Sequence, residues 1–220
     1  MIKAVIFDLD GVIVNSEPIY KKTDMRILES LNITMPPEEY NTWMGTAGDE
    51  MFAMLKEQYG FSQTVEELLE LQLNYMLDEF RSGTFGPFEG VVELVKALRE
   101  ETNVTLAVAS SSPLVYIREI LDRLGILDHF RLILSGESIP RTKPAPDIYI
   151  ECAKRLSVDP MECIVIEDSK NGITAAKGAG MRCIAFYSSK GRNQESDLAD
   201  RVFECMEDIK TYLLRTIRHA

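Results

Sequence analysis

The chain begins with a short apolar run at positions 4–7 that leads directly into Asp8-Leu9-Asp10-Gly11. A run rich in β-branched and aromatic residues predicts a strand buried on both faces, as in a parallel sheet. Residues i and i+2 of an extended backbone point the same way, so Asp8 and Asp10 are expected to direct two carboxylates into one small volume. Ligands of open α/β sheets bind at the carboxyl ends of strands. Because close carboxylates repel each other, we expect this site to hold a divalent cation, to carry out acid–base chemistry, or both.

The same four residues are open to other interpretations. Asp and Gly are common turn formers, and the sequence could simply end a strand. A sugar-transferring enzyme could hold a metal–nucleotide with an Asp-x-Asp pair. An EF-hand loop is disfavoured, because the acidic spacing before Gly11 is too short and no Glu follows at the required distance.

The composition is that of an acidic globular protein. The 220 residues are 45% hydrophobic and carry a formal net charge of −11, which suits one large α/β domain or a core with a smaller appendage. A chain without basic runs is not expected to bind nucleic acid or an anionic membrane. A phosphorylated substrate would need a local pocket of Lys, backbone N–H groups and metal to hold it.

The cysteines and histidines indicate no further chemistry. The four cysteines include no C-x-x-C pair, and Cys163 and Cys183 begin apolar runs, so both are expected in the core. His129 and His219 lie far from any polar cluster in the sequence, which disfavours a Ser-His-Asp or Cys-His mechanism. No signal peptide precedes the first strand and no apolar run reaches membrane-spanning length. We therefore expect a cytoplasmic protein. Separately, we expect it to be a monomer.

The order of the predicted elements indicates two regions. Between Asn15 and about Ser82 only helical patterns occur, and after this block strands and helices alternate. The predicted later strands are 104–109, 132–134, 163–166, 183–186 and 201–203. Repeated strand–helix units of this size predict a parallel sheet with helices on both faces. A helical insert after the first strand could lie over the carboxyl edge of the sheet as a lid.

Other predicted strand ends also carry polar side chains. Ser110 follows the second strand, Glu167 and Asp168 follow the fourth, and Lys143 is expected to open a helix after the third. This set suits phosphoryl transfer, with carboxylates for Mg²⁺ and donors for phosphate oxygens. Each residue has another interpretation: Ser110 as a helix N-cap, Lys143 as a solvated loop residue, and the two acids as helix N-terminal charges. Their occurrence in order at one sheet edge favours a common site.

Taken together, these segments resemble the motifs of the haloacid dehalogenase superfamily, and in particular its β-phosphoglucomutase-like branch. The motifs are Asp8-Leu9-Asp10-Gly11, Ser110 after an apolar strand, Lys143-Pro144 and Ile166-Glu167-Asp168-Ser169. The resemblance covers essentially the whole chain. It implies a Rossmann-like α/β core at 1–14 and 83–220, with an all-helical cap domain inserted at 15–82.

The resemblance also implies roles for the motif residues. Asp8 would attack phosphorus and form an aspartyl-phosphate, while Asp10 would protonate the leaving oxygen and then deprotonate the attacking water or hydroxyl. Ser110 would bind a phosphate oxygen, helped by the backbone N–H of Ser111. Lys143 would neutralise the phosphate and the Asp8 carboxylate.

The implied cofactor is Mg²⁺. Asp8 and Asp168 would bind the ion through their side chains and Asp10 through its main-chain carbonyl. Glu167 would be a further ligand, directly or through water.

Departures from the mutase pattern favour a phosphatase. Mutases of this branch have a histidine early in the first cap helix, where this chain has Tyr20. They also have an arginine after the glycine loop of the cap, where this chain reads Gly45-Thr46-Ala47-Gly48-Asp49-Glu50. We therefore expect hydrolysis of a small phosphorylated metabolite, such as a sugar phosphate, and keep a phosphohexomutase as the alternative. A non-catalytic binding protein and a dehalogenase are less favoured, because neither explains the full set of acidic residues.

The helical insert contributes the candidate specificity residues. They are Tyr20, Trp43, Gly45 and Thr46. The alternative for the two aromatic residues is packing within the insert, which is the usual role of aromatic side chains at helical spacing.

Overall fold

The computed structural model describes residues 1–43, 46, 48–83, 86–187 and 198–218. Gly45, Ala47 and His219 lie outside the described residues. The chain divides into two compact units, one formed by Met1–Asn15 and Gly86–Ala220 and the other by Ser16–Phe85. No described helix has the length and apolar character needed to cross a membrane.

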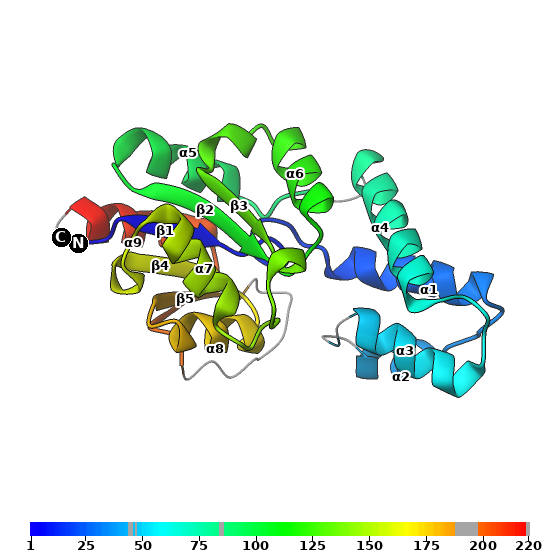
Figure 1. The fold of residues 1–220 in the computed structure, drawn as a ribbon. Helices are drawn as coiled ribbons and strands as arrows, with labels where there is room; N and C mark the ends of the chain where they lie inside the picture. Colours follow the sequence, from blue (N-terminus) through cyan, green and yellow to red (C-terminus); the bar gives the residue numbers. More distant parts are fainter. Residues whose placement is uncertain (44–45, 47, 84–85, 188–197, 219–220) are drawn as a thin grey trace. The chain divides into compact units, whose positions relative to one another are not determined.

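The first unit contains a six-stranded sheet (Figure 1). Its strands are β1 (Ala4–Phe7), β2 (Thr105–Ser110), β3 (Leu132–Ser135), β4 (Cys163–Glu167), β5 (Arg182–Phe186) and β6 (Arg201–Phe203). The strand order is β3-β2-β1-β4-β5-β6, and every neighbouring pair is parallel. The predicted parallel sheet is therefore confirmed, and β1 lies between β2 and β4.

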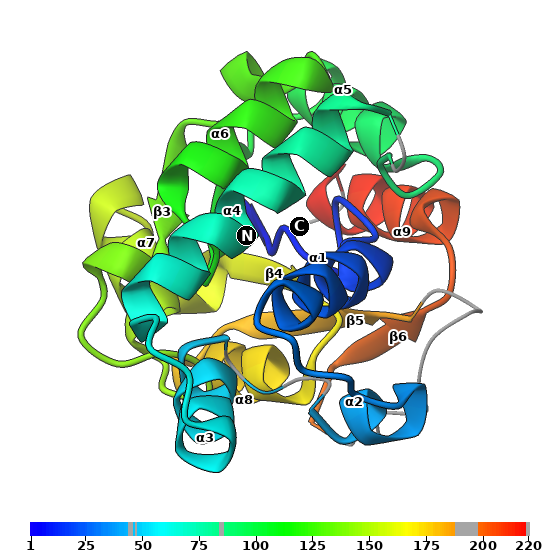
Figure 2. The same cartoon turned by 90° about the vertical axis from the view of Figure 1, so that its right-hand side faces the viewer.

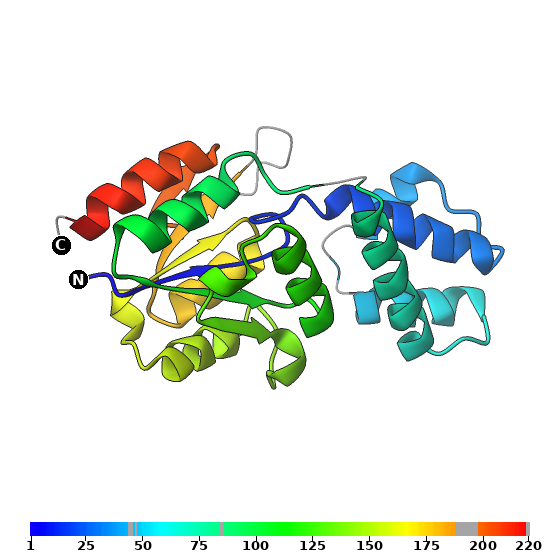
Figure 3. The same cartoon turned by 90° about the horizontal axis from the view of Figure 1, so that it is seen from above.

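Helices cover both faces of this sheet. They are α5 (Val91–Glu101), α6 (Leu114–Arg123), α7 (Asp147–Leu156), α8 (Lys170–Gly178) and α9 (Met206–Arg218). Alternate residues of the central strands, such as Ala4 and Ile6, pack with side chains of α7 and α8 in one apolar cluster that includes Cys163 and Cys183. On the other face α5 and α9 pack against each other (Figure 3). Burial on both faces explains why the strands are continuously apolar.

The strand register brings the predicted polar residues to one edge. Phe7 is level with Val108 on β2 and with Ile166 on β4. The residues that follow, Asp8 and Glu167, therefore emerge together at the carboxyl end of the sheet. The apolar run that continues after Asp10 does not extend β1, because the chain turns back and the backbone N–H groups of positions 12–14 donate to the Leu9 carbonyl.

One predicted element boundary is wrong. Lys143 does not open a helix: α7 starts at Asp147, and Lys143 lies in the turn before it, joined to Pro144 by a cis peptide bond.

The second unit is helical in its described residues. It contains α1 (Glu17–Ser30), α2 (Pro37–Trp43), α3 (Gly48–Tyr59) and α4 (Val65–Arg81), with α4 packed against α1 and α3 (Figure 2). Thr64 forms a capping box with Glu67 at the start of α4, a common helix N-terminal signal. Ser16 occupies the N-cap position of α1, but its side chain makes no capping hydrogen bond.

A buried carboxylate joins three helices of this unit. Asp24 on α1 is only 3% exposed. It accepts hydrogen bonds from the Tyr40 hydroxyl at 2.6 Å and from Gln72 Nε2 at 2.5 Å. Burial raises the pKa of Asp24 above its ordinary value, although both hydrogen bonds oppose the shift. The two hydrogen bonds thus fix how α1, α2 and α4 pack, whereas burial makes ionisation of Asp24 unfavourable.

We predict that Asp24→Asn becomes more stabilising as the pH rises. The pKa of Asp24 is raised in the folded state, so wild-type stability associated with this group is present below pH 3.8 and is lost as the pH rises through the folded-state pKa. An asparagine does not titrate, and its amide can keep both hydrogen bonds if Gln72 turns its amide over.

The measurement is urea unfolding between about pH 4 and pH 7, followed by the fluorescence of Trp43, the only tryptophan in the chain. The free energy of unfolding of Asp24→Asn minus that of the wild type should increase with pH. The exposed Glu57→Gln on α3 is the matched control, for which this difference should vary little. A difference for Asp24→Asn that does not change with pH would contradict the prediction.

Candidate active site

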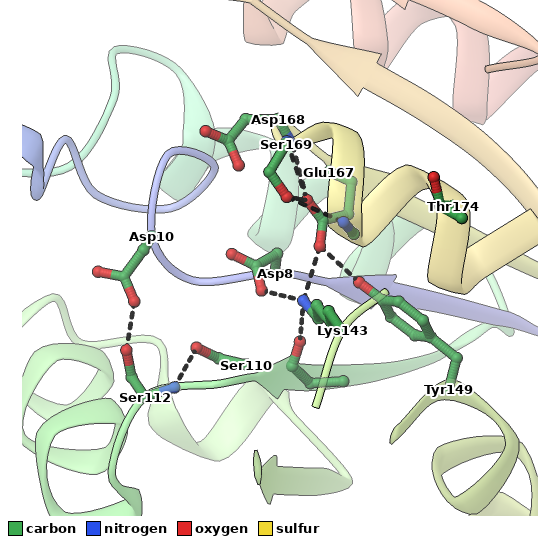
Figure 4. Close-up of polar contacts among 12 residues, drawn as sticks. Asp8, Asp10, Ser110, Ser112, Lys143, Tyr149, Glu167, Asp168, Ser169 and Thr174 are labelled. Atoms are coloured by element: carbon green, nitrogen blue, oxygen red, sulfur yellow. Dashed lines mark hydrogen bonds and ion pairs between the residues drawn. The ribbon is translucent and has the colours of Figure 1, made fainter. Parts of the chain in front are cut away.

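The centre of the site is the ammonium group of Lys143, which lies between two buried carboxylates (Figure 4). Lys143 Nζ is 2.6 Å from Asp8 Oδ1 and 2.6 Å from Glu167 Oε1. It also donates to the Ala109 carbonyl of β2 at 3.4 Å. One side chain from the turn before α7 therefore connects the ends of the three central strands.

Glu167 is held from both sides. Its Oε1 also accepts a hydrogen bond from the Tyr149 hydroxyl at 2.9 Å, while Oε2 accepts from the backbone N–H groups of Asp168 and Ser169. The Ser169 hydroxyl contacts Oε2 at 3.0 Å and also caps α8 by accepting from the N–H of Gly172. These contacts make Glu167 a rigid anchor for Lys143 and leave its oxygens largely committed to protein donors.

Asp168 lies against the backbone of the Asp-x-Asp-Gly turn. Gly11 has a φ of +80°, and a Cβ placed on it would lie 2.0 Å from Asp168 Oδ2. The glycine is therefore required twice, once for its left-handed backbone conformation and once for the close approach of this carboxylate.

The described residues contain a cluster of acids that could hold a metal ion. Asp8, Glu167 and Asp168 each offer a carboxylate oxygen, and these oxygens lie within 4.8 Å of one another. Hard oxygen ligands at this spacing suit Mg²⁺. With Lys143 as the ammonium partner, three carboxylates leave a surplus of negative charge that a divalent cation would balance, so the donor set fits the expected cofactor.

The pKa values reflect burial first and this surplus of charge second. Burial raises the pKa of Asp8 to about 8, with Lys143 opposing the shift and Glu167 adding to it. Burial and the neighbouring Glu167 and Asp8 charges raise the pKa of Asp168 well above its ordinary value. Burial would also raise the pKa of Glu167, but Lys143 and its hydrogen bonds hold it below the usual range. Lys143 stays charged because, against burial, the two carboxylates raise its pKa.

Asp10 is not one of the three carboxylates of this cluster. Its side chain turns toward the end of β2, where Asp10 Oδ2 accepts a hydrogen bond from the Ser112 hydroxyl (Figure 4). Beside burial, the charge of Asp10 adds to the raised pKa of Asp8 and of Asp168, so Asp8 and Asp10 act on the same site. The two aspartates have different partners, one an ammonium group and the other a neutral hydroxyl.

Ser110, at the end of β2, is oriented by the same loop. Its Oγ accepts a hydrogen bond from the Ser112 backbone N–H at 3.1 Å. Because that contact uses an acceptor position, the single hydroxyl hydrogen of Ser110 can be donated elsewhere. Ser111 is exposed between the two buried serines.

The candidate specificity residues belong to the helical unit. Trp43, at the end of α2, is partly buried and packs against the apolar cluster of that unit, as expected for a packing residue. Tyr20 is partly buried on α1, and the Thr46 backbone N–H donates to the Trp43 carbonyl. Gly45 lies outside the described residues.

Two contacts were not predicted from the sequence. Ser112 was visible only as part of a Ser-Ser-Ser run, although its spacing of two from Ser110 could have placed both side chains on one side of the chain. Tyr149 lies in the first turn of α7. Its hydroxyl reaches Glu167 only because α7 begins at Asp147 and runs in the observed direction, which the sequence does not specify.

We predict that Gly172→Ala destabilises the protein. A Cβ at Gly172 would lie 1.7 Å from Glu167 Oε1, and Glu167 cannot move without losing Lys143 and Tyr149. The clash should outweigh the better helix propensity of alanine and lower the free energy of unfolding by about 1–3 kcal/mol.

The matched control is Gly178→Ala at the other end of α8, where the added Cβ would lie 3.4 Å from Pro146 Cβ. This variant should be neutral or more stable in the same urea titration followed by circular dichroism. Equal stability of the two variants would show that Glu167 is not held as rigidly as described.

Comparison with known proteins gives a consistent set of relatives. The family model described as haloacid dehalogenase-like hydrolase matches residues 5–186. YhcW of Bacillus subtilis (strain 168) is 35% identical over 215 residues, which is 97% of this chain and 96% of that protein. Hexitol phosphatase B of Escherichia coli (strain K12) is 30% identical over 197 residues, covering 87% of this chain and 86% of the relative.

The fold comparison agrees with the sequence comparison. The crystal structure of CbbY from Rhodobacter sphaeroides in complex with phosphate superimposes with a TM-score of 0.84 at 26% identity, covering 95% of this chain and 96% of that one. The resemblance drawn from the four motifs is therefore confirmed: the chain belongs to the haloacid dehalogenase-like hydrolases.

Proposed function

We propose that this protein is a Mg²⁺-dependent phosphatase that hydrolyses a small phosphorylated metabolite of the sugar phosphate class through an aspartyl-phosphate on Asp8. The observation that carries the proposal is the Asp8 carboxylate, paired with Lys143 and surrounded by further acids at the carboxyl end of the sheet. A relative named hexitol phosphatase B supports a phosphorylated carbohydrate as the substrate class.

The first half of the reaction transfers the phosphoryl group to the enzyme. The Asp8 carboxylate attacks phosphorus and the bond from phosphorus to the substrate oxygen breaks. Asp10 gives its proton to that oxygen, which leaves as an alcohol. The second half reverses the direction of proton flow: Asp10 takes a proton from water, the water oxygen attacks phosphorus, and the bond to Asp8 breaks to release inorganic phosphate.

The different partners of the two aspartates support these different roles. Burial raises the pKa of Asp8 to about 8, but the contact with the Lys143 ammonium group opposes this rise. A bound Mg²⁺ would oppose it further and favour the ionised form that a nucleophile needs. Asp10 contacts the neutral Ser112 hydroxyl, a contact that is compatible with either protonation state. One carboxylate is thus suited to attack and the other to proton transfer.

The remaining residues bind the phosphate and the ion. Ser110 donates its hydroxyl hydrogen to a phosphate oxygen with the Ser111 backbone N–H beside it, and Lys143 offsets the charge of the phosphate and of Asp8. Asp8, Asp168 and the main-chain carbonyl of Asp10 would hold Mg²⁺, with Glu167 contributing negative charge beside it. The ion would supply charge neutralisation and a fixed orientation for the phosphoryl group.

We propose further that the helical unit acts as a cap that selects the substrate, with Tyr20, Trp43, Gly45 and Thr46 as the residues to test first. This chain has Tyr20 where the mutases have a histidine, and its glycine segment has no arginine. In this proposal the acceptor of the phosphoryl group is therefore water rather than a second sugar hydroxyl.

We predict Mg²⁺-dependent hydrolysis of p-nitrophenyl phosphate that depends on Asp8. EDTA should abolish the activity and added Mg²⁺ should restore it. Asp8→Asn removes the nucleophile and should lower kcat by at least about a thousandfold. The exposed aspartate variant Asp128→Asn, in the same unit, is the control and should retain wild-type kcat. An Asp8→Asn enzyme with wild-type activity would remove Asp8 from its assigned role.

The product of a sugar phosphate distinguishes hydrolysis from isomerisation. With β-glucose 1-phosphate and a glucose bisphosphate activator, we predict release of inorganic phosphate and free glucose. Phosphate release and glucose 6-phosphate are measured in the same reaction. Net formation of glucose 6-phosphate would support the phosphohexomutase instead.

A further inference from the structure

We infer that Ser112 is a positioning residue for proton transfer by Asp10, a role that rests on the proposed function but goes beyond it. The Ser112 hydroxyl donates to Asp10 Oδ2. Ser112 is only 6% exposed and Asp10 is partly buried, so bulk water competes little for this contact. The hydrogen bond fixes the direction in which the Asp10 carboxyl points.

The backbone of Ser112 is itself fixed by two strands. Its N–H donates to Ser110 Oγ at the end of β2, and its carbonyl accepts from the Ser135 hydroxyl at 2.7 Å at the end of β3. Ser110 and Ser135 are paired in the sheet register. The hydroxyl of Ser112 is therefore presented to Asp10 from a loop that is anchored to the ends of β2 and β3.

Close packing adds to this rigidity. Gly136, directly after β3, lies so near the loop that a Cβ on it would be 3.1 Å from Ser111 Cα. The Ser135 hydroxyl also accepts from the Glu137 backbone N–H at 3.2 Å. The chain of contacts runs from β3 through Ser135 and Ser112 to Asp10, so one loop orients both the phosphate-binding Ser110 and the proton-transferring Asp10.

In this arrangement Ser112→Ala removes the side-chain contact with Asp10 without removing a backbone contact. The Ser112 backbone N–H and carbonyl keep their contacts with Ser110 and Ser135, and only the hydroxyl that holds Asp10 is lost. The expected defect is specific to proton transfer. An alkoxide leaving group needs the Asp10 proton, whereas p-nitrophenolate is stable enough to leave without it.

The test compares two substrates on each enzyme. We measure kcat/KM for p-nitrophenyl phosphate and for a simple alkyl phosphate, because kcat/KM covers the steps up to formation of the aspartyl-phosphate. For Ser112→Ala, kcat/KM for the alkyl phosphate should fall by about tenfold or more, since general acid catalysis supplies a factor of about 10² to 10⁴. The value for p-nitrophenyl phosphate should fall by less than about threefold.

Two further variants complete the design. Ser112→Thr keeps a hydroxyl and should keep the wild-type ratio of the two kcat/KM values. Ser138→Ala removes a hydroxyl that donates to the Ser135 carbonyl at 3.1 Å but does not contact Asp10, and it should also keep that ratio. The ratio is measured within one preparation, so a reduced fraction of folded enzyme does not alter it.

The outcomes separate this inference from the proposed function. If wild-type enzyme hydrolyses neither substrate in Mg²⁺, the proposed function fails. If the wild type is active and Ser112→Ala leaves the ratio unchanged, whether both values fall together or neither falls, the role of Ser112 in proton transfer is overturned.

Discussion

The ion pair of Lys143 with Asp8 and Glu167 is the interaction on which the site depends. Taking three charged groups out of water costs several kcal/mol for each ion, and only close, hydrogen-bonded pairing offsets that cost. Here the ammonium lies 2.6 Å from an oxygen of each carboxylate. Removing Lys143 would leave two buried carboxylates without their shared cation, so the residue is needed for the integrity of the site as well as for its chemistry.

Around this ion pair, the backbone is arranged to let carboxylates approach closely. Gly11 leaves room for Asp168 and Gly172 leaves room for Glu167. The N-terminal turn of α8 adds backbone donors that hold Glu167 in place. Burial raises the pKa of Asp8 and of Asp168, and the excess of negative charge adds to this rise and also makes the cluster suited to a divalent cation. The buried carboxylates whose pKa is raised are therefore among the groups that would bind the cation.

The sheet and the residues that gather at its edge could be predicted from the sequence, because parallel strands have continuous apolar patterns and their carboxyl ends meet. Asp8, Ser110, Lys143, Glu167 and Asp168 were found in this way. The direction of the Asp10 side chain could not be predicted, because it depends on the tight turn at Gly11. Nor could Tyr149, whose contact with Glu167 depends on the position at which α7 begins. Ser112 was hidden in a serine run whose members differ only in their three-dimensional contacts.

The central claim is that Asp8 carries the phosphoryl group, and the most direct measurement is to find it there. Enzyme mixed with a rapidly hydrolysed phosphate ester in Mg²⁺ is quenched in acid during turnover, digested and analysed by mass spectrometry. The account predicts an acid-stable, hydroxylamine-sensitive phosphoryl group on the peptide that contains Asp8. Turnover with no phosphoryl group on that peptide, or with the group on a different residue, would contradict it.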